Sequence, residues 1–134
     1  MILTRCSDQK SQTLDEFYQR LATTSESPWD QQRGEGMLSL IRRLRAEPDQ
    51  RVVFGLTSHG WLVLLAEDTY DSLWYVTIAS AGLERYRIEY LMRAEDSPWA
   101  GYAHVAGEAT SEDQAVAMIW IAMEKSGGWL GQSA

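Results

Sequence analysis

The residue types that most often carry chemistry are few in this chain and widely separated. The two histidines, His59 and His104, lie beside a turn glycine and in a strand-like run, at no spacing that would pair them as ligands of one metal ion. The single cysteine, Cys6, has no neighbouring base or cation to make its thiol a nucleophile. We therefore expect no metal site, no cofactor and no catalytic residues, and an enzyme is not the first interpretation.

Phosphate chemistry is not indicated either. Gly34-x-Gly36 and Gly127-Gly128 lack the flanking strand, lysine and hydroxyl of a phosphate-binding loop. Ser58 and Ser80 are not set in the glycine-flanked turn that exposes a nucleophilic serine.

Acidic and aromatic side chains in loops remain as candidates for binding. Glu67-Asp68 and Glu95-Asp96 are carboxylate pairs in predicted loops, where acids are either simply solvated or form the rim of a protein-binding surface. Large aromatic residues lie close to both pairs in the sequence. The candidate set for contact with a protein partner is Glu67, Asp68, Tyr70, Asp71, Glu95, Asp96 and Trp99.

A predicted sheet must position these loops. Four runs with strand-like composition, residues 51–57, 61–66, 73–79 and 84–91, are joined by connections of about three to six residues, which are too short for parallel crossovers. Run 61–66 is apolar on both faces, as in a central strand. Residues 102–107 are a weaker fifth candidate, and residues 1–4 are a candidate for an edge strand. We expect an antiparallel meander of four or five strands.

Three helices are predicted around this sheet. Thr13-Leu-Asp-Glu16 and Ser111-Glu-Asp-Gln114 have the pattern of capping boxes, each followed by an apolar stripe at helical spacing. A further helix is expected over about residues 35–46. The polar segment 25–36, with Gly34 and Gly36, is predicted to be a mobile loop, in which Ser27-Pro28 could begin a short helical turn. We predict that the N-terminal helices and the C-terminal helix pack on one face of the sheet, in a single α+β domain of residues 1–134.

The tryptophans divide into two groups. Trp61, Trp74 and Trp120 lie inside apolar patterns and are predicted to build the core. The other three, Trp29, Trp99 and Trp129, have no such pattern. Gly127 is suited to the left-handed position that ends the C-terminal helix, and Trp129-Leu130 could fold back there as its hydrophobic contact.

One strand face is charged. Arg85, Arg87 and Glu89 alternate with apolar residues, so they either contact a partner, pair across strands, or are covered by the helices.

Composition limits the partners. With 134 residues, of which 45% are hydrophobic, the chain is long enough for one well-packed core. Its 12 basic and 19 acidic residues give a net charge of -7, which opposes general binding to nucleic acid or to anionic membrane and favours a basic partner. One cysteine and no apolar run of membrane-spanning or signal-peptide type lead us to expect a cytoplasmic protein.

Three segments suggest a protein class. The run Tyr86-Arg-Ile-Glu-Tyr-Leu91, the loop Ser97-Pro98-Trp99 and the C-terminal stretch Ile121-Ala-Met-Glu-Lys-Ser-Gly-Gly-Trp129, within a small acidic α+β chain, resemble the immunity proteins that bacteria carry against their own secreted toxins. The resemblance implies that the chain binds a toxin domain and neutralises it by covering its active site or another surface that the toxin needs. The negative charge of the chain would suit a basic toxin domain.

Two other functions remain open. The first is a small enzyme or ligand-binding domain, with a pocket between sheet and helices near Tyr90, Tyr102 and His104. The second is a regulatory subunit that forms a homodimer through an edge strand.

Overall fold

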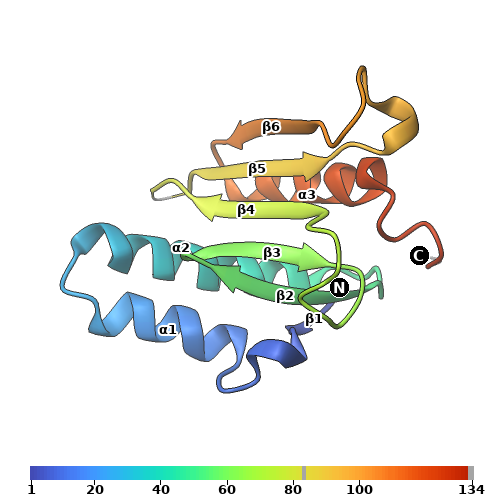
Figure 1. Cartoon of the computed structure of the whole chain (residues 1–134). Helices are drawn as coiled ribbons and strands as arrows, with labels where there is room; N and C mark the ends of the chain where they lie inside the picture. The colour runs from blue at the N-terminus through green and yellow to red at the C-terminus, as the bar shows by residue number, and fades with distance from the viewer. Residues whose placement is uncertain (83, 133–134) are drawn as a thin grey trace.

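A six-stranded sheet, with strands in the order of the chain, is the centre of the computed structural model, which describes residues 1–82 and 84–132 (Figure 1). Only β1 and β2 are parallel, and each later pair of neighbours is antiparallel. The bounds are β1 (Ile2–Arg5), β2 (Val52–Ser58), β3 (Trp61–Leu65), β4 (Val76–Ser80), β5 (Tyr86–Leu91) and β6 (His104–Ala109).

The α+β class and the sequential strand order are therefore confirmed, but a purely antiparallel sheet of four or five strands is wrong. The candidate edge strand at the N-terminus forms, and it runs parallel to β2. The reason is the long connection between them, because two helices bring the chain back to the starting end of β1 before β2 begins.

Three helices, α1 (Leu14–Thr24), α2 (Pro28–Ala46) and α3 (Glu112–Ser126), cover one face of the sheet. Their buried side chains share one core with the inward residues of the strands. Figure 1 views the sheet from the other side, with α2 and α3 behind the strands. Short 3-10 turns lie at Ser7–Gln9 and Ala94–Asp96. Within the described part of the chain, no helix has both the length and the apolarity needed to cross a membrane.

The capping box predicted at Thr13 forms in full, and the one predicted at Ser111 forms only in part. The Glu16 amide donates to the Thr13 hydroxyl over 3.1 Å, and the Thr13 amide donates to the Glu16 carboxylate over 2.9 Å. At α3 the Gln114 amide donates to Ser111, whereas the Gln114 side chain accepts from the amide of Thr110 rather than from that of Ser111. Gly127 ends α3 in the left-handed conformation, with φ of 78°.

Helix α2 begins earlier than predicted, at the possible helical turn of Ser27-Pro28, and residues 28–36 of the expected mobile loop are helical. Pro28 occupies the first turn, and Ser27 caps the helix by accepting from the Asp30 amide. Both glycines lie at close approaches: a Cβ at Gly34 would be 2.6 Å from the Ala22 amide nitrogen, and one at Gly36 would be 2.9 Å from the Ser80 hydroxyl oxygen. They permit tight packing here, so they do not mark a loop.

Strand β3 is buried on both faces, as its apolar run predicted. Leu62 and Leu64 join the large core beneath the helices. Val63 and Leu65 belong to a second, smaller cluster on the opposite face, which contains Cys6, Leu56 and the partly buried Phe54. Only part of that opposite face is covered, which leaves the remainder open for a binding site.

Candidate functional site

On the face of the sheet opposite the helices, the part beside the small apolar cluster is covered by a 3-10 turn and a loop. Beside the small cluster, the 3-10 turn at Ser7–Gln9 is tied to the loop between β3 and β4. The Ser7 amide donates to Asp68 over 2.7 Å, and the Tyr70 amide donates to Asp8 over 2.9 Å. These bonds hold the β3–β4 loop in place.

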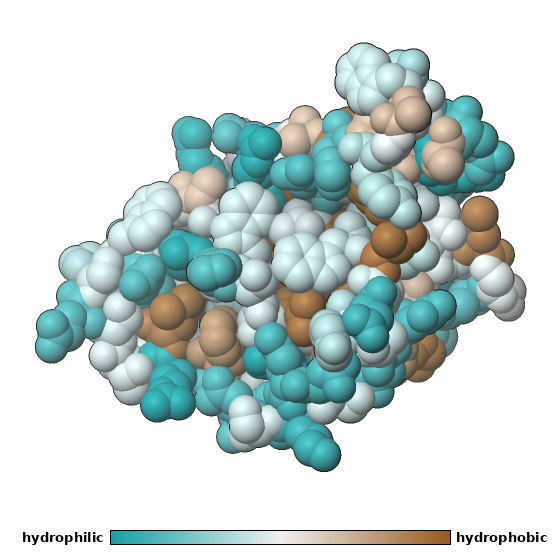
Figure 2. Space-filling view, viewed as in Figure 1, coloured by the Kyte–Doolittle hydropathy of each residue, from teal (hydrophilic) through white to brown (hydrophobic). Residues whose placement is uncertain are grey.

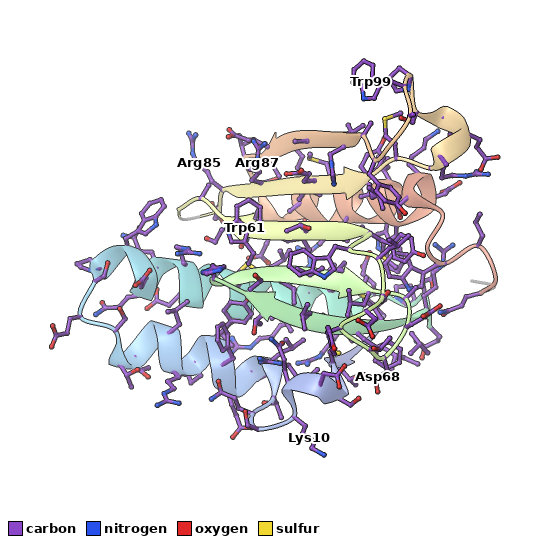
Figure 3. All side chains as sticks on the ribbon, viewed as in Figure 1. Lys10, Trp61, Asp68, Arg85, Arg87 and Trp99 are labelled. Atoms are coloured by element: carbon purple, nitrogen blue, oxygen red, sulfur yellow. The ribbon has the colours of Figure 1, made fainter. Side chains whose placement is uncertain are left out.

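No helix of the described residues covers the rest of this face. Strand register places Val63, Thr77 and Glu89 side by side on adjacent strands, with Trp61 one step along β3. Figure 2 shows this face, where pale aromatic rings occupy the centre over β3 and β4 between hydrophilic side chains. In Figure 3, Trp61 lies over the exposed face of the sheet.

A shallow hollow of 230 Å³ is lined by Trp61, Trp74 and Thr77, together with Ser58 and His59. Trp61 is half-buried, while Trp74 is 45% exposed. The two indoles thus form a concave apolar feature on an otherwise polar face.

The role of His59 is conformational. His59 and Gly60 join β2 to β3 with φ of 53° and 83°, the left-handed values of a tight two-residue hairpin. Arg33 donates to the His59 carbonyl over 3.1 Å, which supports this turn from α2.

The acidic residues predicted in the β3–β4 loop are all exposed. Asp68 is used internally, since it accepts from Ser7. Glu67 and Asp71 make no side-chain hydrogen bond or salt bridge with the described residues. Tyr70, in the same loop, is 62% exposed. This half of the predicted set lies at the end of the uncovered face.

The other half of the set lies in the loop between β5 and β6. Arg93 donates to Glu95 over 2.7 Å, Asp96 ends the 3-10 turn, and Trp99 is 70% exposed. Both loops leave the same end of the sheet, because β3 and β5 run in the same direction (Figure 1). In Figure 3, however, Asp68 lies near the β1 side and Trp99 projects beyond β6. The predicted residues therefore form two patches.

Several functional candidates were assigned wrongly from the sequence. Trp61 and Trp74 were predicted in the core, yet they line the uncovered face, and Trp120 is only partly buried. Of the pair expected to fold back after Gly127, Trp129 is buried and Leu130 is 66% exposed. The predicted strand run 73–79 starts too early: Trp74 lies two residues after the polar segment 67–72, and β4 begins only at Val76.

The structure also places the charged strand face and the residues of the predicted pocket. Arg87 and Glu89 lie on the uncovered face, so the helices do not cover them, and Arg87 lies opposite Glu108 of β6. Tyr90 and His104 do not converge on a pocket, because their register positions put them on opposite faces of the sheet. Tyr90 lines a groove beneath β6, and His104 is exposed.

Titratable groups with shifted pKa values lie away from the uncovered face. Burial raises the pKa of the Cys6 thiol and of the Tyr18 and Tyr86 hydroxyls, and it lowers the pKa of Arg5. Among the described residues, no cluster of three or more His, Cys, Asp or Glu could hold a metal ion.

Comparison with known protein families, with curated proteins and with solved structures finds no match for this chain.

Proposed function

We propose that this chain binds another protein through Trp61, Tyr70, Leu73 and Trp74, here called the aromatic surface, with Glu67 and Asp71 at its rim. The observation that carries the proposal is the presence of large apolar side chains, exposed by 42% to 62% in the β3–β4 loop, beside the half-buried Trp61. Exposed aromatics next to one another are typical of interaction sites.

The aromatic surface has the physical features of a binding anchor. Trp61 is on a strand buried on both faces, and Trp74 adjoins β4, so both indoles are held by rigid structure. Preorganised aromatic rings lose little conformational entropy when a partner covers them. Glu67 and Asp71 remain free to meet cations at the rim.

We further propose that the partner is a basic bacterial toxin domain, which the chain neutralises by binding. Two observations support this class of partner. The net charge is -7, and residues 51–134, which contain the aromatic surface, hold 11 acidic and 5 basic side chains. Such a field speeds the approach of a cationic protein. The resemblance of three segments to immunity proteins supplies the choice of a toxin.

The experiment uses the purified chain as bait for toxin domains encoded in its host. With a captured domain in hand, binding kinetics are measured for Trp61→Ala/Trp74→Ala and for Glu67→Lys/Asp71→Lys. We expect the tryptophan variant to dissociate at least about tenfold faster, since buried aromatic anchors control dissociation. The lysine variant should associate more slowly and show less dependence on salt.

Matched controls are available elsewhere on the surface. Trp29→Ala removes an exposed indole from the start of α2, and Glu26→Lys/Glu124→Lys reverses two exposed acids away from the uncovered face. Both should bind like the unmodified chain. The toxin's own activity should disappear at one equivalent of the chain. Unchanged binding by the tryptophan variant, or a bound toxin that stays active, contradicts the corresponding part of the proposal.

A further inference from the structure

Strand β6 is an open edge of the sheet, and its outward backbone groups can be identified from the register. The Met92 amide donates to the Ala103 carbonyl, so this pair exchanges hydrogen bonds within the ladder. Bonded pairs alternate along antiparallel strands, which makes Val105 and Gly107 the residues bonded to β5. The N–H and C=O groups of His104, Ala106 and Glu108 consequently point away from the sheet.

The two edges of the sheet differ in protection. At β1, Arg45 of α2 donates from Nε to the Leu3 carbonyl over 3.1 Å. No described residue bonds in this way to the outward groups of β6. The six residues of β6 also include no proline or lysine, the residues that commonly block pairing at an edge.

An apolar groove of 220 Å³ runs beneath this edge, between β6 and α3. Val105 and Gly107 form one side, and Met118 and Ile121 form the other. Ile121 is 55% exposed, although it lies in a helix that otherwise contributes to the core. Free backbone groups and apolar side chains thus occur together along β6.

We propose that two copies of this chain pair through β6, antiparallel to each other, about a two-fold axis at Ala106. In this register Ala106 faces its own counterpart, and each such outward residue exchanges backbone hydrogen bonds with the partner strand. The two sheets become one continuous sheet. This assembly is independent of the aromatic surface, which lies over β3 and the β3–β4 loop.

Complementary side chains favour a second copy in this register. His104 lies opposite the partner's Glu108, and Glu108 lies opposite the partner's His104, so an imidazole meets a carboxylate twice. Moving the axis to Glu108 would place two carboxylates opposite each other, and moving it to His104 would place two imidazoles opposite each other. Arg87 lies opposite Glu108 on β5, so each Glu108 carboxylate would lie between an arginine of its own chain and an imidazole of the other.

The apolar side of the strand is also self-complementary. Val105 lies opposite the partner's Gly107, where there is no side chain to obstruct it. Met118 and Ile121 flank the same groove, so pairing brings the two copies of this apolar surface together across the axis.

The test is the oligomeric state of the full chain, measured by sedimentation over a range of concentrations at neutral pH. His104→Glu places two like-charged pairs at the axis and should weaken the dimer about tenfold. The exchanged variant His104→Glu/Glu108→His restores both imidazole–carboxylate pairs and should regain the dimer. Both side chains are exposed, so the monomer fold should survive, which circular dichroism and melting will check.

Trp61→Ala/Trp74→Ala is the matched control and should dimerise normally. A chain that stays monomeric at every concentration overturns the proposal. So does a His104→Glu variant that dimerises as well as the unmodified chain, or an exchanged variant that remains as weak as His104→Glu. None of these results depends on whether a toxin is bound.

Discussion

Trp129 is the tryptophan that most firmly joins distant parts of the chain. It is 2% exposed, its Nε1 donates to the Val52 carbonyl over 3.0 Å, and its ring lies 5.6 Å from that of Tyr75. It follows the Gly127 cap of α3 and so fastens the C-terminal segment to β2. Trp120, by contrast, is partly buried on α3 and donates to the Glu47 carboxylate over 2.9 Å.

The two tryptophans should therefore differ in their effect on stability. We expect Trp129→Ala to lower the free energy of unfolding by about 3 to 5 kcal/mol, the range for fully buried large aromatics. Trp120→Ala should lower it by about 1 to 2 kcal/mol, since its side chain remains partly exposed to water in the folded chain. Urea denaturation of both variants measures this, and the opposite order would show that Trp129 is not held in the core.

At the scale of elements, the contact between α1 and α2 depends on a single glycine. Gly34 lies where the two helix backbones approach most closely, and a Cβ there would be 2.7 Å from the Tyr18 carbonyl oxygen as well as close to Ala22. Both neighbours are backbone atoms, so neither can rotate away. Any side chain at this position must push the helices apart.

Gly34→Ala is accordingly expected to destabilise the protein by about 1 to 3 kcal/mol. The sign of this change in stability is informative, because replacing glycine by alanine inside a helix ordinarily stabilises a protein by roughly 0.5 to 1 kcal/mol. Gly131→Ala is the control: nothing lies within 4 Å of the position that a Cβ would take there, and its effect should stay within about 0.5 kcal/mol. Thermal melts of both variants suffice. A gain in stability for Gly34→Ala would mean that the helices are less closely packed.

At the scale of the whole molecule, one core extends from Met1 to Trp129 and includes side chains from all three helices. We expect such a core to unfold in one cooperative step. Titration of any buried group should then change the stability of the entire chain.

The buried hydroxyls set an alkaline limit on that stability. Desolvation raises the pKa of Tyr18 and Tyr86 in the folded chain. A tyrosine in the unfolded chain has a pKa of about 10. Above that pH the folded chain therefore binds more protons than the unfolded chain. Their contribution is complete below pH 10 and is lost as pH rises towards the folded pKa. Cys6, whose pKa is also raised by burial, acts in the same direction from about pH 8.5.

Urea denaturation from pH 7 to pH 11 should thus show little change at first and then a steady loss. Tyr86→Phe should reduce the steepness of the loss, whereas Tyr102→Phe, at an exposed position, should leave the profile unchanged. A stability that is level up to pH 11 would contradict the assignment of buried, neutral tyrosines. Unfolding transitions followed by different spectroscopic probes should also coincide, because cooperative unfolding requires it.

Local pattern in the sequence was sufficient for the class of fold, for most strands and for the helix ends other than the start of α2. The Thr13–Glu16 cap, the Gly127 end and the alternation of β5 depend on residues within a few positions of each other, so nearest neighbours in the chain determine them. The same holds for the exposed loops that carry Tyr70 and Trp99.

Only the tertiary structure decided what lies across from each element. The parallel direction of β1, the helical setting of Gly34, the burial of Trp129 and the exposure of Trp74 each depend on which distant segment packs against that residue. Alternation shows that Trp61 and Leu62 point to opposite faces of β3, but it contains no information about which face the helices cover. That choice is made by long-range packing, and it determines which side of the sheet remains free to bind.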